Sequence, residues 1–180
     1  MTTTELTTLF KVLHGDVKEA INKLNSSPEN RAFYERSYIR AFASWVEGTI
    51  WMYKDLLKNL PDQKHLGLPL EYQLFLMDID WTIKNSGDPK IRTKKIATTE
   101  NLKAFFRLVQ KFYPEFKAEL SGDGFSNVIS MFKIRDRLMH PSSNNGLSIS
   151  ETELRGCEHG REWFISQMSQ LNSCIEQSCT

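Results

Sequence analysis

The stretch FSNVISMFKIRDRLMHP, residues 125–141, decides the fold class of this chain. A helix turns by about 100° per residue. On that wheel the apolar residues between Phe125 and Met139 cover more than half of the circumference. A helix that is apolar over so wide an arc packs against neighbours on several sides. The stretch therefore predicts a central helix of a helical bundle, which ends before Pro141.

The rest of the chain has the same helical period, and no convincing alternating strand is present. Ser27 and Pro28 are typical of a helix start, and Ser150 and Glu153 form an S-x-x-E capping box. We expect one all-α, up-and-down domain over residues 1–180, with its core at about 28–175 and a first helix, 5–24, packed on it. The expected helices cover about 5–24, 28–60, 70–85, 100–112, 125–139 and 151–175.

Composition excludes several classes of protein. The net charge of +1 gives no general attraction to polyanions, so nucleic-acid binding would need a local patch. Three cysteines without a C-x-x-C pair argue against a disulfide scaffold or a zinc site and favour a reducing cytoplasm. No signal peptide is expected, and the most apolar window, 39–57, is too polar to span a bilayer. We expect a cytoplasmic protein with no metal, no cofactor and no membrane partner.

Two charged residues of the central helix fall where apolar ones are expected. On the wheel Arg135 lies at about 280° and Asp136 at about 20° from Phe125, both inside the apolar arc. Lys133 and Arg137 lie in the polar wedge and should face water. A buried charge is costly unless it is paired, and adjacent helix residues do not face one another. Arg135 and Asp136 are therefore each expected to find a partner on another helix, another chain or a ligand.

His140 stands between this helix and Pro141. The helix should end there, which frees the imidazole to turn toward Arg135. An arginine that holds a phosphate and a histidine that exchanges a proton near neutral pH together suit phosphodiester chemistry. The alternative is a structural ion pair at Arg135 and a simple helix end at His140. The residues alone leave both interpretations open.

The pattern Arg135-x4-His140, with a polar residue after the arginine and a proline after the histidine, closes the next-to-last expected helix. It resembles the signature of the HEPN superfamily (higher eukaryotes and prokaryotes nucleotide-binding). The long helix that includes residues 29–48 is similar to the early helix of many prokaryotic members. The resemblance implies a four- to six-helix bundle that dimerises, with both motifs in one cleft. Some toxin members carry a tyrosine where this chain has Ser142, so the resemblance to that subgroup is weaker.

Active members of the family are metal-independent endoribonucleases of toxin–antitoxin and phage-defence systems. By that resemblance Arg135 would bind the scissile phosphate of RNA, and Asp136 would orient a reacting group. His140 would move the proton of the 2′-hydroxyl or of the leaving 5′-oxygen. The products would be a 2′,3′-cyclic phosphate and a 5′-hydroxyl, and a cognate antitoxin or regulatory protein is a further expected partner. Other members are non-catalytic, so a helical dimer that only binds RNA or protein is the alternative.

Further residues are candidates for the same region. Arg137, Arg36 and Arg40 are candidate RNA contacts, and Tyr34 and Tyr38 between them would stack on bases or belong to the core or a dimer contact. Glu47 is either a solvated position on its helix or a carboxylate that holds Arg135 from across the bundle.

Two other features have alternatives of their own. Gly48 costs helix stability and is explained by a close approach of two helices. The basic strip Lys90–Lys95 is either a solvated connector or a phosphate-contacting segment.

Overall fold

The computed structural model describes residues 3–59, 68–94 and 96–178. The chain is mostly helical, with six α-helices and one small antiparallel hairpin in the described part. Two short 3-10 turns, η1 and η3, precede the second and sixth helices. The elements are α1 (Thr3–Ser26), η1 (Pro28–Asn30), α2 (Arg31–Lys58), α3 (Leu70–Leu76), β1 (Ile79–Ile83), β2 (Pro89–Thr93), α4 (Thr98–Phe112), α5 (Asp123–Met139), η3 (Asn144–Leu147) and α6 (Glu151–Ser178).

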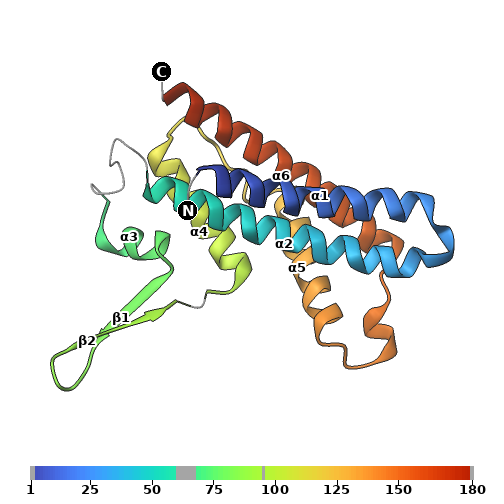
Figure 1. Cartoon of the computed structure of the whole chain (residues 1–180), viewed down its shortest axis with the longest axis horizontal. Coiled ribbons are helices and arrows are strands. Elements are labelled where there is room, and N and C mark those ends of the chain that lie inside the picture. The colour runs from blue at the N-terminus through green and yellow to red at the C-terminus, as the bar shows by residue number, and fades with distance from the viewer. Residues whose placement is uncertain (1–2, 60–67, 95, 179–180) are drawn as a thin grey trace.

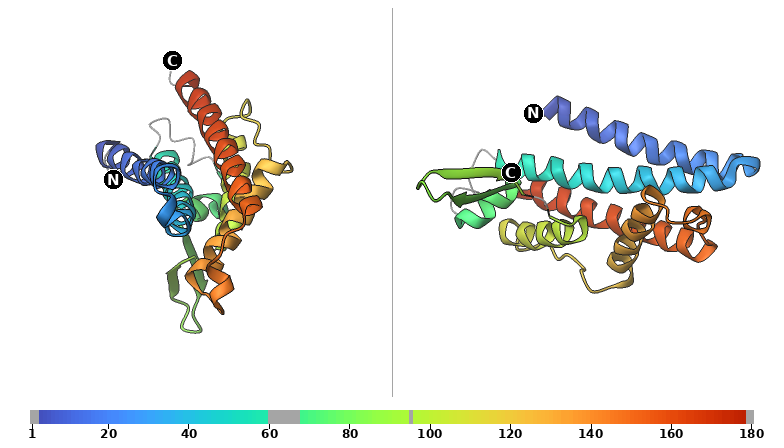
Figure 2. Two further views of the ribbon diagram at one scale, coloured as in Figure 1. Left: turned by 90° about the vertical axis from the view of Figure 1, so that its right-hand side faces the viewer. Right: turned by 90° about the horizontal axis from the view of Figure 1, so that it is seen from below.

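Three long helices, α1, α2 and α6, extend along the long axis of the molecule, with α4 and α5 on one side of them (Figures 1 and 2). The chain turns back at η1, so α1 packs along α2. The helix α6 packs along α5. The middle of α2 supplies much of the core, and residues of the other helices close around it. Fully buried side chains there include Tyr38, Ile39, Phe42 and Val46. None of the described helices is long and apolar enough to cross a membrane.

Two glycines lie where helices pack closely. A side chain at Gly48 of α2 would run into the side chain of Leu13 on α1, so the close approach predicted at Gly48 is present. Gly160 of α6 lies against the backbone of Asn127 and Val128 on α5. At Gly160 only a residue without a Cβ lets the two backbones approach so closely, whereas at Gly48 the nearest atom is the end of a side chain.

The expected helix over residues 70–85 is wrong in its second half. The helix α3 ends at Leu76, and β1 and β2 then pair from Ile79↔Thr93 to Ile83↔Pro89. Asp78 has a φ of 53° and Gly87 a φ of 85°, so left-handed residues stand at the helix end and in the turn. The alternation of Ile79, Trp81 and Ile83 with polar residues is short, and the apolar side chains at 81 and 83 remain exposed.

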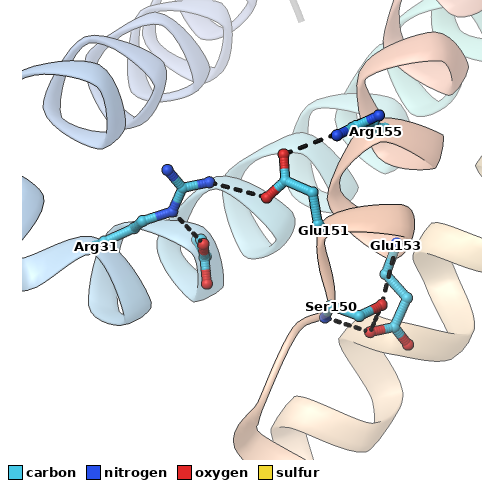
Figure 3. Close-up of polar contacts among 6 residues, drawn as sticks. Arg31, Ser150, Glu151, Glu153 and Arg155 are labelled. Atoms are coloured by element: carbon cyan, nitrogen blue, oxygen red, sulfur yellow. Dashed lines mark hydrogen bonds and ion pairs between the residues drawn. The ribbon is translucent and has the colours of Figure 1, made fainter.

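The start of α6 has the predicted capping box (Figure 3). The Ser150 N–H donates to Glu153 Oε2 at 2.8 Å, and the Glu153 N–H donates to Ser150 Oγ at 3.2 Å. Arg31 at the start of α2 donates to Glu151 Oε2 at 3.1 Å. These contacts fix where α6 begins and join it to α2. Ser27 makes no side-chain cap, and Pro28 begins η1 rather than α2.

Candidate functional site

Glu47 joins three helices through one carboxylate oxygen. Arg135 Nη2 on α5 donates to Glu47 Oε1 at 2.7 Å, and Thr98 Oγ1 at the start of α4 donates to the same oxygen at 2.9 Å. The side chain of Arg135 is 25% exposed and that of Glu47 is 41% exposed. The contact is the one required by the second interpretation of Glu47, a carboxylate that holds Arg135 from across the bundle. The guanidinium therefore has a fixed position but still reaches the surface.

Asp136 does not point inward. Its side chain is 66% exposed, and Oδ1 lies 3.4 Å from Arg135 Nη1. The expectation that it is buried, with a partner other than Arg135, is therefore wrong. A helical wheel describes Cα directions, whereas a long arginine side chain can bend back to an adjacent residue. Arg135 consequently lies between two carboxylates, while its Nε is buried without a hydrogen-bond partner among the described residues.

His140 ends α5 as expected. Its backbone N–H donates to the carbonyl of Asp136 at 3.0 Å, and its φ of −129° and ψ of 62° leave the helical region. The residue is exposed, and its imidazole makes no hydrogen bond or ion pair with any described residue. The ion-pair partners of Arg135 among the described residues are Glu47 and Asp136, and the approach of the ring to Arg135 stays a prediction. The imidazole remains free to meet another molecule.

Arg137 is held by the protein instead of facing water alone. Its Nη1 donates to Glu153 Oε1 at 2.9 Å, and its Nη2 donates to the carbonyl of Ser148 at 2.8 Å. Burial acts to raise the pKa of Glu153, but hydrogen bonds from Arg137 and Ser150 outweigh it and hold that pKa below its usual range. The wheel missed this because the segment after Pro141 folds back over the polar face of α5. Arg137 is thus committed to the start of α6.

The other two candidate arginines lie on α2. Arg40 Nη2 donates to the carbonyl of Leu138 at 3.3 Å. This carbonyl lies at the C-terminal end of α5, where the helix dipole stabilises a positive charge. Arg36 lines a cavity of about 380 Å³ between α2 and the η3 segment, and its side chain has no hydrogen bond to the described residues. Tyr38 is 1% exposed and belongs to the core, so it is not available to stack on a base. Of the three arginines predicted to contact RNA, Arg36 keeps the freest side chain.

A second polar cluster near Glu47 was not predicted. Lys54 is 1% exposed, its Nζ lies 2.5 Å from Asp78 Oδ1, and the ammonium sits 3.8 Å from the centre of the Phe75 ring. Burial lowers the pKa of Lys54, and the hydrogen bond with Asp78 opposes that shift. Lys54 continues the apolar row of Val46 and Ile50 at intervals of four residues, which is the sequence signal that could have revealed it.

The basic strip belongs to the hairpin. Lys90 and Arg92 lie on β2, and Lys94 follows it; all three are exposed. Arg92 Nη2 lies 2.7 Å from Asp80 Oδ2 on the neighbouring strand. The strip is therefore part of an exposed strand, and the charge of Arg92 is compensated by Asp80. Lys95 lies outside the described residues.

No family model matches the chain, and neither a curated protein nor a solved structure matches it. In the described part of the chain no group of three or more histidine, cysteine or carboxylate side chains is placed to hold a metal ion.

Proposed function

We propose that the protein is a metal-independent endoribonuclease of HEPN type, acting as a toxin or an antiviral-defence effector. The observation that carries the proposal is the Arg135–Glu47 ion pair. It holds a guanidinium at the surface five residues before a histidine that has no partner in the described chain. Such a guanidinium can bind a phosphate through its remaining N–H groups once the exposed Asp136 turns away.

The reaction uses the 2′-hydroxyl of RNA as the nucleophile. Its oxygen attacks the adjacent phosphorus, the bond from phosphorus to the 5′-oxygen breaks, and a 2′,3′-cyclic phosphate and a 5′-hydroxyl remain. Arg135 neutralises the charge that builds on the phosphate oxygens. His140 takes the proton of the 2′-hydroxyl or supplies one to the 5′-oxygen. By the HEPN resemblance the site is completed at a homodimer interface, with a regulatory or antitoxin protein as a further partner.

The test is RNA cleavage in the presence of EDTA. We expect the wild type to leave 2′,3′-cyclic phosphate ends and His140→Ala to lose at least 100-fold in rate, the lower end of the contribution typical of a general acid or base, about 10²–10⁴. His159→Ala is the matched control, because His159 is an exposed histidine on α6. An inactive wild type, or an active His140→Ala variant, would contradict the proposal.

The second candidate is a non-catalytic dimer that binds RNA or protein. It is favoured by the fact that both ion pairs of Arg135, with Glu47 and with Asp136, lie within the chain. In that case Arg135→Ala would lower the melting temperature or dissociate the dimer, and no variant would cut RNA. A third arrangement uses the exposed cations of β2 to bind RNA without cleavage. Loss of salt-dependent binding in Lys90→Ala would favour it.

A further inference from the structure

A cavity of about 250 Å³ lies between α2, the start of α4 and the junction of α3 with β1. Its polar wall is formed by Glu47, Trp51, Lys54, Asp78, Thr98 and Asn101, and apolar side chains of α2 and α4 complete it. The volume lies just below the range of about 300–1,000 Å³ typical of ligand pockets. It therefore suits one ring system better than a whole nucleotide.

The cavity shares a wall with the candidate catalytic site. Glu47 holds Arg135 through Oε1 and also lines the cavity. Thr98 does the same from α4, because it donates to that oxygen and lies on the cavity wall. A phosphate on Arg135 and a group in the cavity would thus be separated by about one side chain, as the phosphate and the base of one nucleotide are.

The charges in the cavity disfavour a phosphate. Lys54 supplies one cation, and its ammonium is already paired with Asp78 Oδ1 at 2.5 Å. Glu47 adds a second carboxylate, which is paired with Arg135, so neither cation is left uncompensated. A neutral group that donates several hydrogen bonds fits this wall better than an anion does.

Asn101 gives an independent sign of a missing ligand. Its Oδ1 is buried, and among the described residues no donor reaches it. A buried acceptor without a partner costs about 1–3 kcal/mol. Asp78 on the same wall has a φ of 53°, the left-handed conformation that an aspartate tolerates just after a helix end. A buried acceptor without a partner calls for an explanation, and a bound molecule that donates to it is one.

Guanine has the complementary edge. Its N1–H and 2-amino group are donors for Asn101 Oδ1 and a carboxylate, and its O6 accepts from Lys54. Adenine and cytosine offer one amino group on that edge, and uracil offers one N–H. Trp51, which is 43% exposed on the cavity wall, provides an aromatic face for the ring.

We propose that this cavity is a guanine subsite, which selects the RNA by placing a guanine beside the phosphate held by Arg135. This inference rests on the proposed function for its role, but the binding of the base can be measured without cleavage.

The test is calorimetric titration of the whole chain with the four ribonucleoside 5′-monophosphates, with guanosine and with inorganic phosphate. We expect 5′-GMP to bind at least 10-fold more tightly than the other three. Guanosine should still bind, and inorganic phosphate should not displace it. Asn101→Ala and the more exposed Trp51→Ala should each weaken guanosine binding at least 5-fold. Asn22→Ala on α1 is the matched control and should leave it unchanged.

Arg135→Ala separates the two proposals, because it removes the phosphate contact and should leave guanosine binding in place. Guanosine binding by a chain that never cuts RNA would contradict the proposed nuclease activity and support the guanine subsite. RNA cleavage without preference for guanine, together with equal binding of all four nucleotides, would contradict the guanine subsite and support the nuclease activity. Unchanged guanosine binding in both Asn101→Ala and Trp51→Ala would also overturn it.

Discussion

The oxygen Oε1 of Glu47 accepts from residues of two other helices, so this single atom fixes both the rotamer of Arg135 and the start of α4. Asp136 can compensate only in part for its loss, because its side chain is mostly exposed and its contact with Arg135 is longer. Glu47 therefore fixes where the guanidinium of Arg135 lies.

We therefore predict that Glu47→Ala, which removes the shared acceptor oxygen, lowers stability modestly and activity strongly. A partly exposed ion pair contributes about 0–1 kcal/mol, so the urea midpoint should shift only slightly. The RNA cleavage rate should fall at least 10-fold, since Arg135 is no longer held in one place. Glu35→Ala is the control, because Glu35 pairs with Arg31 away from the site. Equal cleavage by the two variants would show that Glu47 does not position Arg135.

Cys157 makes stability depend on alkaline pH. It is 1% exposed, and burial raises the pKa of its thiol to about 12 from 9.0. The folded state keeps the proton that the unfolded state loses, so this contribution is complete below pH 9 and is lost as the pH rises toward 12. From pH 8.5 to 10.5 we expect the wild type to lose about 2 kcal/mol more than Cys157→Ala does, by urea unfolding. Parallel losses in the two proteins would contradict this assignment, since the buried tyrosines act equally in both.

Residue types on a wheel predicted part of the site. The conflict between an arginine and an apolar arc is visible in the sequence, and it identified Arg135 as a residue that needs a partner. The opposite result for Asp136, and the capture of Arg137 by Glu153, depend on side-chain length and on the path of the segment after Pro141. Neither is encoded by local periodicity. Lys54 had a visible signal, since it interrupts an apolar row on α2.

At the scale of elements, α5 and α6 approach each other through Gly160. A Cβ at that position would lie 3.0 Å from the backbone nitrogen of Val128, and a backbone atom cannot move aside as a side chain end can. The contact therefore sets how closely the motif helix lies on α6.

Gly160→Ala should destabilise the protein even though alanine is the better helix former. The gain in helix propensity, roughly 0.5–1 kcal/mol, is outweighed by an overpacking cost of roughly 1–3 kcal/mol. Gly15→Ala on α1 is the control, because open space surrounds that position, and it should stabilise the protein by about 0.5–1 kcal/mol. Thermal unfolding of both variants checks the sign. A stabilising Gly160→Ala would mean that the two helices lie further apart.

The longer helices were predictable here because each has its own apolar period, and most of their ends lie near turn or capping residues such as Ser150 and Gly122. The hairpin was not predictable on that basis. Its strands are five residues each, and one strand begins with a proline that is tolerated at a strand start. What separates strand from helix in this segment is the pairing of Asp80 with Arg92 across the two strands, which becomes visible only once they are aligned.

At the scale of the whole molecule, the hairpin and the η3 end of α5 project from the same side of the long helices (Figures 1 and 2). Along the chain α4 follows the hairpin and α5 precedes η3. The candidate site at Glu47 is formed where these two helices meet α2. Met139, beside His140, is 53% exposed. The apolar residues Trp81, Ile83 and Ile91 of the hairpin are exposed too. An exposed apolar side chain next to a histidine that has no partner among the described residues is what a two-fold contact at the motif would cover.

The division of labour between chains can be tested by mixing inactive variants. Arg135→Ala and His140→Ala should each be inactive. If Arg135 of one chain works with His140 of its partner, unfolding and refolding the two together should restore roughly a quarter of the wild-type cleavage rate, since about half of the dimers are mixed and each has one intact site. Cleavage of RNA in EDTA is the measurement, and the double variant mixed with itself is the control. Mixed dimers that remain inactive would show that both residues must come from one chain, and that His140 has to turn toward its own Arg135 when RNA binds.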